Sequence, residues 1–309
     1  MRSSGIKHTY IIPKESNLNS RQNVYVCSFF VILALLVFLP VLLVIMAAFS
    51  SENSVSMYGY RFIPHEFSVE SFRYMFSSGS TLPGSFLNSL IITVSGTLLS
   101  LVIMTPCAYA MSRREFRYRG ILMIYLMIPM IFSGGLVSTY MVNTQILHLK
   151  NTYLALILPT LCSTWYLMLM INYFRSTVSD SIVESAKIDG AMPVQTFISI
   201  VLPICRPVIM TVAIFQIFAY WNSWYPALLY IDTNHSELYP LQYVLVNIDR
   251  SIQAMILDAQ YMSGMSGYTP PSVTLRMAMV VVAVAPIMVL FPFFQNFLKT
   301  GLTVGSVKG

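Results

Sequence analysis

Charged residues are scarce in this sequence. Of its 309 residues, only 10% are Asp, Glu, Lys or Arg, whereas 56% are hydrophobic. A soluble domain usually carries about 25% charged residues. The scarcity of charge therefore excludes an ordinary soluble domain, and the mean hydropathy of +0.68 is typical of an integral membrane protein.

The charges are absent from six long windows, which are residues 22–51, 74–112, 120–149, 151–174, 207–231 and 277–298. Each window holds at least 22 residues, and a helix needs about 20 to cross the hydrocarbon core. Strands of a transmembrane barrel would be about 10 residues long and would alternate in polarity, unlike these windows. The sequence therefore predicts an all-α integral membrane protein with six transmembrane helices, at residues 23–49, 86–110, 119–142, 152–173, 205–231 and 275–298.

The distribution of Lys and Arg predicts the orientation. With both termini in the cytoplasm, 13 of the 18 basic residues lie on the cytoplasmic side, four of them in the loop RREFRYR at 113–119. The net charge of +6 then reflects how the chain is oriented in the membrane. A nucleic-acid-binding protein would gather its basic residues on one soluble face, which this chain lacks. We expect a multi-pass protein of the cell membrane.

Patterns for metal, cofactor or catalytic sites are also lacking. The four cysteines fall in or beside four different predicted spans with no pair spacing, and the four histidines are scattered. No glycine begins the G-x-x-x-x-G-K-[ST] pattern of an ATP-binding loop. We expect no enzyme activity and no cofactor or metal on this chain.

The predicted spans divide the chain into five parts. These are a cytoplasmic tail at 1–22, the first transmembrane helix at 23–49, an extracellular segment at 50–85, a core with five spans and a cytoplasmic loop (179–203) at 86–300, and a cytoplasmic tail at 301–309. The outside segments 50–85 and 232–274 are much longer than usual helix connections. They either contact an extracellular binding protein or only cap the bundle.

A charged, amphipathic stretch interrupts the apolar sequence. Ser181 and Glu184 form a capping-box pattern, which predicts a helix start near Ser181. Gly190 is suited to the turn that ends this helix, Pro193 to the start of a second helix, and Pro203 to its end.

The second helix has an apolar face. Val194, Phe197, Ile198 and Val201 repeat at helical spacing, and Gln195, Thr196 and Ser199 share the other face. The apolar face is expected to rest on the bundle or the membrane, which leaves Glu184, Lys187 and Asp189 for a soluble partner. The alternative is an interfacial amphipathic helix with no partner.

The same stretch resembles a known element. ESAKIDGA at 184–191, followed by a Phe and then IVLP, resembles the EAA loop of ABC-importer permeases, with Ser185 in place of the first Ala of that name. The ending FPFFQNFLKTGLTVGSVKG resembles the MalG-type subunit of carbohydrate importers. The pieces FLNSLIIT at 86–93, CAYAMSRREF at 107–116 and WNSWYPALLY at 221–230 also match in order. The resemblance extends from about residue 60 to the end.

The resemblance implies a role for particular residues. The EAA loop docks into a cleft on a cytoplasmic ATPase, and the residues that take the coupling role here are Glu184, Ser185, Ala186, Asp189, Gly190, Ala191, Phe197 and Pro203. The tail with Gly301, Gly305 and Lys308 resembles one that reaches between two ATPase subunits. The alternative for the tail is a frayed terminus.

The resemblance also implies partners and a mechanism. They are a second permease subunit that completes a heterodimer, two cytoplasmic ATPase subunits that hold ATP and Mg, an extracellular or periplasmic substrate-binding protein, and membrane lipid, with no nucleic acid. The cargo is a carbohydrate, in particular an oligosaccharide, moved by alternating access. The alternatives are an ABC permease for another solute class and an ion-coupled secondary transporter. The secondary transporter would be expected to carry ionisable residues inside its spans, and the six windows hold no Asp, Glu, Lys or Arg.

Candidates for a substrate path lie in the predicted second and fifth spans. They are Trp221, Asn222, Trp224, Tyr225 and Asn88. Aromatic faces stack on sugar rings, and an Asn amide offers both a donor and an acceptor to hydroxyl groups. Aromatic residues near a membrane boundary also form an ordinary interfacial belt or pack the bundle, and both alternatives stay open here.

Overall fold

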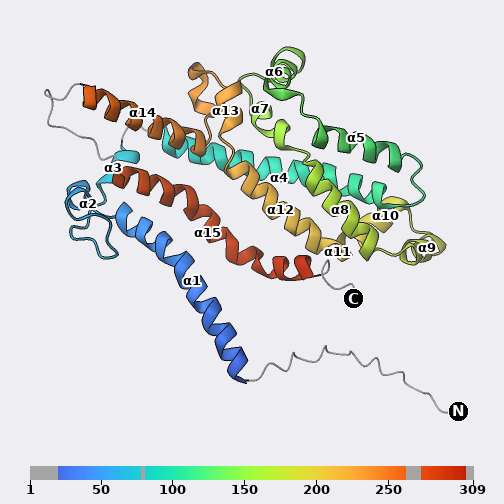
Figure 1. The fold of residues 1–309 in the computed structure, drawn as a ribbon. Coiled ribbons are helices and arrows are strands. Elements are labelled where there is room, and N and C mark those ends of the chain that lie inside the picture. The colour runs from blue at the N-terminus through green and yellow to red at the C-terminus, as the bar shows by residue number, and fades with distance from the viewer. Residues whose placement is uncertain (1–19, 78–80, 262–272, 304–309) are drawn as a thin grey trace.

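A computed structural model describes residues 20–77, 81–261 and 273–303 of the chain (Figure 1). Almost all secondary structure in these ranges is helical. The one strand-like contact among them is an isolated antiparallel bridge between Ser50 and Phe67. The predicted all-α class is confirmed.

Three of the predicted spans are continuous helices. They are α1 (Ser20–Ala48), α4 (Leu82–Ser112) and α15 (Val273–Thr303). Each is long and apolar enough to cross a membrane. The helices α4 and α15 extend beyond both predicted ends, whereas α1 begins before its predicted start and ends one residue before its predicted end. Pro40, Pro106, Pro286 and Pro292 lie inside these helices without ending them.

The predicted third span is not one straight helix. It consists of α5 (Arg119–Ile131), α6 (Gly135–Met141) and the π-helix η1 (Val142–Ile146), with a bend of 120° after α5. The break follows Pro129, and Gly135 has φ +79°, a left-handed conformation that glycine adopts easily. Residues on both sides of this bend are apolar, so the window without charged residues does not reveal the bend.

The fourth and fifth predicted spans are also broken. The fourth comprises α7 (Tyr153–Ile157), η2 (Leu158–Thr160) and α8 (Thr164–Thr177), with a bend of 49°. In the fifth, α12 (Arg206–Trp221) ends at Asn222, and α13 (Tyr225–Tyr230) follows. Pro226 lies in the first turn of α13, where its missing amide is tolerated, but it cannot continue the hydrogen bonding of α12. The prediction of one helix over 205–231 is wrong for this reason. The described residues give up to six spans when each bent pair counts as one, and the third such pair joins residues 193–204 to α12 rather than α12 to α13.

The helix α12 forms the centre of the bundle. It contacts α4, α8 and α15, which surround it in Figure 1. Gly96 on α4 lies under the ring of Tyr220 on α12, and the Tyr220 hydroxyl donates a 3.0 Å hydrogen bond to the carbonyl of Ile157. The absence of a side chain at Gly96 lets the two helices approach closely.

Two large apolar clusters and a smaller one, formed by Leu149, Ala155 and Tyr230, fill the described bundle. The cluster nearer the loop 113–118 contains Met104, Met111, Met170, Phe174 and Val208. The cluster nearer the opposite end brings α15 and α14 (Leu241–Tyr261) together with α4 and α12, and includes Trp221, Leu241 and Leu275. Inside a bilayer, where lipid is as apolar as these side chains, their close van der Waals packing rather than removal from water holds the helices together.

The long segment after α1 folds over one end of the bundle. It contains α2 (Glu52–Tyr58) and α3 (Glu70–Met75), and the segment after α13 contains η4 (Thr233–Leu238) and α14. The Glu52 carboxylate accepts hydrogen bonds from the amides of Val273 and Thr274, at 3.1 and 2.9 Å. The segment after α1 is therefore held to the start of α15, and the segment after α13 contacts the same place through the ion pair of Asp249 with Arg276.

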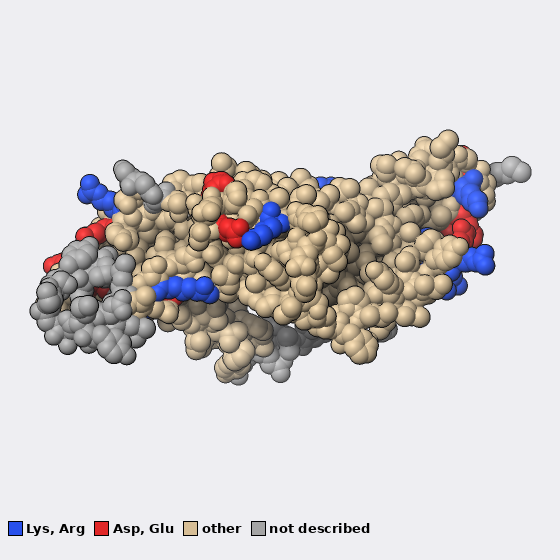
Figure 2. Space-filling model, turned by 90° about the horizontal axis from the view of Figure 1, so that it is seen from above, with Lys and Arg blue, Asp and Glu red and all other residues tan. Residues whose placement is uncertain are grey.

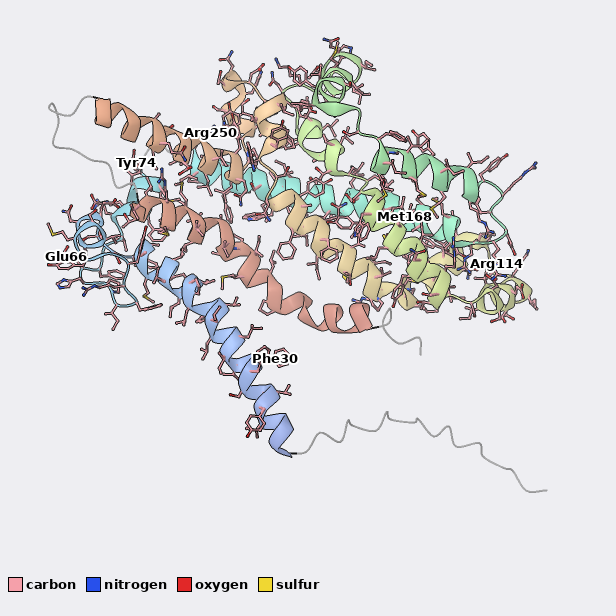
Figure 3. All side chains as sticks on the ribbon, in the orientation of Figure 1. Phe30, Glu66, Tyr74, Arg114, Met168 and Arg250 are labelled. Carbon is pink, nitrogen blue, oxygen red and sulfur yellow. The ribbon has the colours of Figure 1, made fainter. Side chains whose placement is uncertain are left out.

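The first helix packs on α15 near its C-terminal end and diverges from the bundle over the rest of its length. In Figure 1, α1 leans away from the bundle, and its side chains from Val24 to Val41 are exposed. Phe30, labelled in Figure 3, is 59% exposed. Such a continuous apolar surface is stable only when hydrocarbon or another apolar surface covers it.

Candidate functional site

The charged stretch forms two short helical segments that meet at a sharp turn. The first is α9 (Asp180–Ile188), and the second runs through α10 (Pro193–Thr196), the π-helix η3 (Phe197–Val201) and α11 (Leu202–Ile204). These segments lie at the right-hand end of Figure 1, between α8 and α12 in the chain. We call residues 179–203 the coupling loop.

The start of α9 differs from the predicted capping box. Ser179 is the N-cap residue, and its hydroxyl lies 2.9 Å from the hydroxyl of Ser181 rather than on a helix amide. The Ser185 hydroxyl donates to the Ser181 carbonyl. The helix begins earlier than predicted because Asp180 occupies its first turn, where a carboxylate interacts favourably with the helix dipole.

The end of α9 confirms the left-handed turn expected at Gly190. This residue has φ +83°, its amide donates to the Lys187 carbonyl, and the Ala191 amide donates to the Ala186 carbonyl at 2.9 Å. This pair of bonds is a Schellman motif, which ends a helix on a left-handed residue. No atom lies within 4 Å of the place that a Cβ on Gly190 would take, so the backbone conformation, not space, requires glycine.

The second segment departs from the predicted pattern. Val201 is fully buried and Phe197 is half-buried, whereas Val194 and Ile198 are 68% and 56% exposed. Thr196, predicted on the polar face, is buried. Thr196 and Val201 are five positions apart, which is the spacing of hydrogen-bonded residues in a π-helix. The wider turn of η3 therefore places a different set of side chains on the buried face.

Pro203 does not end the second segment. It lies within α11, and the chain bends at Cys205, before α12, by 77°. The π-helix immediately before Pro203 removes the clash that a proline ring makes with an α-helical carbonyl. The prediction that Pro203 closes the helix is wrong.

The coupling loop exposes both charged and apolar side chains. Glu184, Lys187 and Asp189 are exposed, as predicted. The apolar side chains Ile188, Met192, Val194 and Ile198 are also exposed, by 86%, 73%, 68% and 56%. Of the other candidate residues, Ser185 is exposed, Ala191 is partly buried, and Ala186 is buried. Side chains of both kinds are therefore free for contact with a partner.

Arg113 connects the coupling loop to two spans, a role that its use as a topology signal did not predict. It follows the end of α4, and its guanidinium donates to the carbonyls of Phe174 and Val178 at 3.3 and 3.0 Å. It also lies 3.5 Å from the carboxylate of Asp180, while its side chain is only 13% exposed. The end of α8 and the start of α9 are thus held to the end of α4.

A groove runs between α4 and the coupling loop. It has a volume of about 580 Å³, and Arg114 and Glu115 line one side while Asp180, Glu184 and Lys187 line the other. Figure 2 shows blue and red side chains close together at the right-hand end of the molecule. The groove has charges of both signs and no group arranged for covalent chemistry, so it suits the docking of a protein surface.

The predicted tail residues are only partly described. Gly301 lies in the last turn of α15, which continues to Thr303. Gly305 and Lys308 lie outside the described residues.

The substrate-path candidates divide into two groups. Trp221 and Asn88 are buried and make internal hydrogen bonds. The Trp221 indole donates to the Ala283 carbonyl at 2.9 Å, and the Asn88 amide bonds the carbonyls of Glu237 and Tyr239 and the hydroxyl of Tyr153. The Trp221 bond joins α12 to α15, and the Asn88 bonds join α4 to α7 and to the segment that contains η4, so both residues have a packing role.

The other candidates are accessible. Asn222 and Tyr225 are exposed, and Trp224 is half-buried beside the break between α12 and α13. The guanidinium of Arg250, labelled in Figure 3, lies 5.6 Å from the centre of the Trp224 ring. An arginine at this place was not among the predicted path residues, because Arg250 is 26 positions away in the sequence.

Comparison with known proteins identifies the family. Residues 96–304 match the family described as "Binding-protein-dependent transport system inner membrane component". The chain belongs to this family. It is therefore a membrane permease subunit of an ABC importer, as the resemblance implied, and it works with a second permease subunit, ATPase subunits and a substrate-binding protein.

Individual relatives agree with this membership. The chain is 37% identical over 281 residues to the polygalacturonan/rhamnogalacturonan transport system permease protein YtcP of Bacillus subtilis, covering 91% of this chain and 96% of that protein. It is 26% identical to the trehalose/maltose transport system permease protein MalG of Thermococcus litoralis, covering 90% and 94%. It shares its fold with a chain of a bacterial ABC transporter for the acidic polysaccharide alginate, with a TM-score of 0.75, 23% identity and coverage of 92% and 99%.

Proposed function

We propose that this permease forms one half of the membrane core of an importer that carries an oligosaccharide into the cell. ATP and Mg are bound and ATP is hydrolysed on separate cytoplasmic ATPase subunits, and the permease alternates between outward-open and inward-open states. The coupling loop, residues 179–203, transmits the motion of the ATPase to the spans.

The observation that carries this proposal is the exposed surface of the coupling loop. Ile188 and Met192, beside the turn at Gly190, are among the most exposed large apolar side chains of the described chain. Apolar side chains grouped on a rigid turn and rimmed by charge are typical of a protein–protein contact. An interfacial helix without a partner would turn its apolar face toward the membrane. Here, Arg113 holds the loop at the end of α4, and these side chains remain open to a soluble partner.

The contacts of Arg113 provide a route for the motion. A shift of α9 acts on α4 and α8 through the Arg113–Asp180 pair, and a shift of α11 acts on α12 through the bend at Cys205. These helices surround the centre of the bundle, so a small displacement of the loop changes their packing together.

The orientation of the chain in the membrane follows from the basic residues near the coupling loop. Arg113, Arg114, Arg117 and Arg119 lie in or beside the loop that contacts α9, and Arg175 lies in the last turn of α8. The concentration of basic residues favours the cytoplasmic side for this end. Both termini are then cytoplasmic, and α2, α3 and α14 face outward.

The relatives indicate the class of solute. The names of YtcP and MalG specify a polygalacturonan or rhamnogalacturonan and trehalose or maltose, and other relatives are named for arabinooligosaccharides. All of these are carbohydrates. An oligosaccharide of galacturonic acid is the first solute to test, because the relative with 37% identity is named for its polymer.

The accessible residues at the outer end of α12 are the proposed entrance of the solute path. Trp224 and Tyr225 offer aromatic faces to sugar rings, and Asn222 offers an amide to their hydroxyl groups. Arg250, over the Trp224 ring, adds a positive charge that suits the carboxylate of a uronic acid.

The experiment compares uptake in cells that lack the chain with uptake in cells to which it has been restored. Labelled tetragalacturonate, arabinotetraose and maltotetraose are supplied separately, and Glu184→Lys serves as the uncoupled control. Restored uptake of one of these sugars, lost again in Glu184→Lys, supports the proposal and names the sugar. Equal uptake with and without the chain for all three sugars would contradict the carbohydrate assignment.

A second measurement tests the assembly separately. The tagged chain is purified from its own membranes in mild detergent, and its companions are identified by mass spectrometry. Recovery of a second permease and an ATPase supports the coupling role whatever the solute. Recovery of a stable, monodisperse chain alone would contradict it.

A further inference from the structure

A basic cavity lies beside the groove of the coupling loop and shares Arg114 with it. It has a volume of about 610 Å³ and is lined by Arg114, Arg119, Gly120, Met123 and Arg175. The three arginines come from three elements, namely the loop after α4, the first residue of α5 and the last turn of α8. Residues from distant parts of the chain therefore concentrate positive charge at one place.

The positive charge of this cavity is not balanced by the protein. No acidic residue lines it. Neither Arg119 nor Arg175 forms an ion pair with any residue that the structure describes, and Arg114 makes only a long contact of 3.8 Å to Asp180 with its side chain 84% exposed. Like charges held close together repel one another. An anion that contacts two or three of them would relieve this repulsion.

The start of α5 adds to the attraction for an anion. This helix has 13 residues, and its N-cap residue Tyr118 makes no side-chain hydrogen bond to the first amides. The positive end of the helix dipole therefore faces the cavity. Gly120 has no atom within 4 Å of the place that a Cβ would take, so an anion can approach the backbone there.

An apolar surface continues from the cavity along α5. Ile121, Ile124, Tyr125 and Ile128 are exposed by 68%, 65%, 68% and 50%. These residues follow Arg119 directly into the membrane-spanning segment, so the cavity lies at the boundary between the headgroups and the hydrocarbon core. Among common anions, a lipid phosphate has acyl chains attached that match this surface.

We propose that this cavity binds the phosphate headgroup of an anionic phospholipid, with the acyl chains lying along the exposed face of α5. Arg119 and Arg175 hold the phosphate, and Arg114 contributes as a mobile third charge. Since Arg114 also contacts Asp180 at the start of the coupling loop, a bound lipid would affect the position of that loop. The site is independent of the solute and of the proposed direction of transport.

The test measures lipid retention by the full chain. The purified chain is incubated with equal amounts of phosphatidylglycerol and phosphatidylcholine, and native mass spectrometry counts the lipids that remain bound. The variants are Arg119→Gln with Arg175→Gln, Arg119→Lys with Arg175→Lys, and the control Arg117→Gln. Arg117 is an exposed arginine of the same loop that does not line the cavity, so this control changes charge but not the site.

The expected result is selective retention of one phosphatidylglycerol by the unmodified chain and by Arg117→Gln. Each arginine near an anionic surface contributes about 1 kcal/mol, or roughly a five-fold change in binding. The double glutamine variant should therefore lose retention on the order of 25-fold, and the double lysine variant should keep part of it, because lysine retains the charge without the fork geometry.

Four outcomes would overturn the proposal. The first is equal retention of the two lipids by the unmodified chain. The second is an equal loss in Arg117→Gln, which would show a general charge effect. The third is displacement of the lipid by millimolar glycerol phosphate, which would identify a site for soluble phosphates. If the double glutamine variant keeps the lipid but no longer co-purifies with the ATPase, the cavity is instead a protein contact.

Discussion

The guanidinium of Arg113 donates a hydrogen bond of 3.0 Å to the backbone carbonyl of Val178, across 65 positions of sequence. It donates a second bond to Phe174, so two of the last carbonyls of α8 have a charged donor from the end of α4. The Phe174 carbonyl also accepts the amide of Val178, so Arg113 gives it a second donor and caps the helix end at Val178. The coupling loop begins at the next residue after this contact, so its position depends on one side chain.

Replacing Arg113 should therefore weaken both stability and transport. Arg113→Gln removes the side-chain donor from the carbonyl of the buried residue Val178, while the Phe174 carbonyl keeps the Val178 amide, and the loss of a donor at a buried carbonyl costs about 1–3 kcal/mol. We expect a lower melting temperature for the purified chain and reduced uptake. Arg113→Lys should recover only part of the melting temperature and of the uptake, because a lysine cannot bond several acceptors in one plane. Arg117→Gln, a control of the same charge change, should behave as the unmodified chain. An equal effect of both glutamine variants would contradict the role of Arg113.

Gly190 offers a test of the coupling turn with a close control. Both Gly190 and Gly59 have positive φ, +83° and +72°, and neither has an atom within 4 Å of the place that a Cβ would take. Valine at either place costs about 1–2 kcal/mol or more of backbone strain. Because only Gly190 lies in the coupling loop, Gly190→Val should abolish uptake while the chain stays in the membrane, and Gly59→Val should lower stability alone. An equal reduction of uptake in both variants would contradict a specific role of Gly190 in coupling.

The packing of α4 on α12 should be sensitive at Gly96. A Cβ there would lie 2.6 Å from the ring of Tyr220, which is buried and held by its hydroxyl, so the ring cannot move aside. We expect Gly96→Ala to destabilise the chain by about 1–3 kcal/mol, measured as thermal unfolding in detergent. Gly84→Ala, in the same helix with open space around it, should be neutral or slightly stabilising. Equal melting temperatures for the two variants would show that the helices separate without cost.

The outer end of the molecule should loosen when Glu52 is replaced. Its carboxylate accepts bonds from the amides of Val273 and Thr274 and from the Thr274 hydroxyl, at 3.1, 2.9 and 2.7 Å. Removing a helix cap typically costs about 1 kcal/mol, so Glu52→Ala should lower the melting temperature and increase proteolysis of the 50–77 segment. Glu70→Ala, also an acidic residue in a first turn, serves as the control. If Glu70→Ala has the larger effect, the bonds from Glu52 to α15 are not what holds the segment.

A pH-dependent contact joins two outer loops. The amide of Asn151 and the ammonium of Lys150 hold the pKa of Asp232 below its ordinary value, because both interact with the carboxylate. A lowered pKa in the folded state contributes stability that is fully present above the ordinary Asp pKa of about 3.9 and is lost as the pH falls through the lowered value.

The difference in melting temperature between the unmodified chain and Asp232→Asn should therefore be largest near neutral pH and shrink below about pH 4. Asparagine cannot titrate, so the variant supplies the baseline. A constant difference from pH 7 to pH 3 would contradict the effect of the charge.

Much of the fold was predictable because the membrane imposes a simple requirement. A segment that crosses hydrocarbon must be apolar and must satisfy its own backbone, so windows without charge locate helices directly. α1, α4 and α15 were located in this way. The turn at Gly190 was also predictable, since a left-handed residue after a helix is a local property of the chain.

The breaks in the other spans were not predictable from apolar windows. The bend after α5 and the separation of α12 from α13 depend on Pro129, Gly135 and Pro226, but Pro106 and Pro286 lie inside helices that continue. Whether a proline bends or breaks a helix depends on which neighbours satisfy the freed backbone groups. The π-helix before Pro203 changed the buried face of the coupling loop for a similar reason.

Composition and local pattern were enough to predict that the chain is helical, that it crosses a membrane, and that it carries an amphipathic loop with a glycine turn. These properties depend on composition and on residues within a few positions of one another. Three features became visible only in the folded chain. Arg113 holds the coupling loop, Trp221 and Asn88 serve in packing, and Arg114, Arg119 and Arg175 line one cavity. Each of these depends on contacts between residues far apart in the chain, where the free energy of packing, rather than local preference, selects the partner.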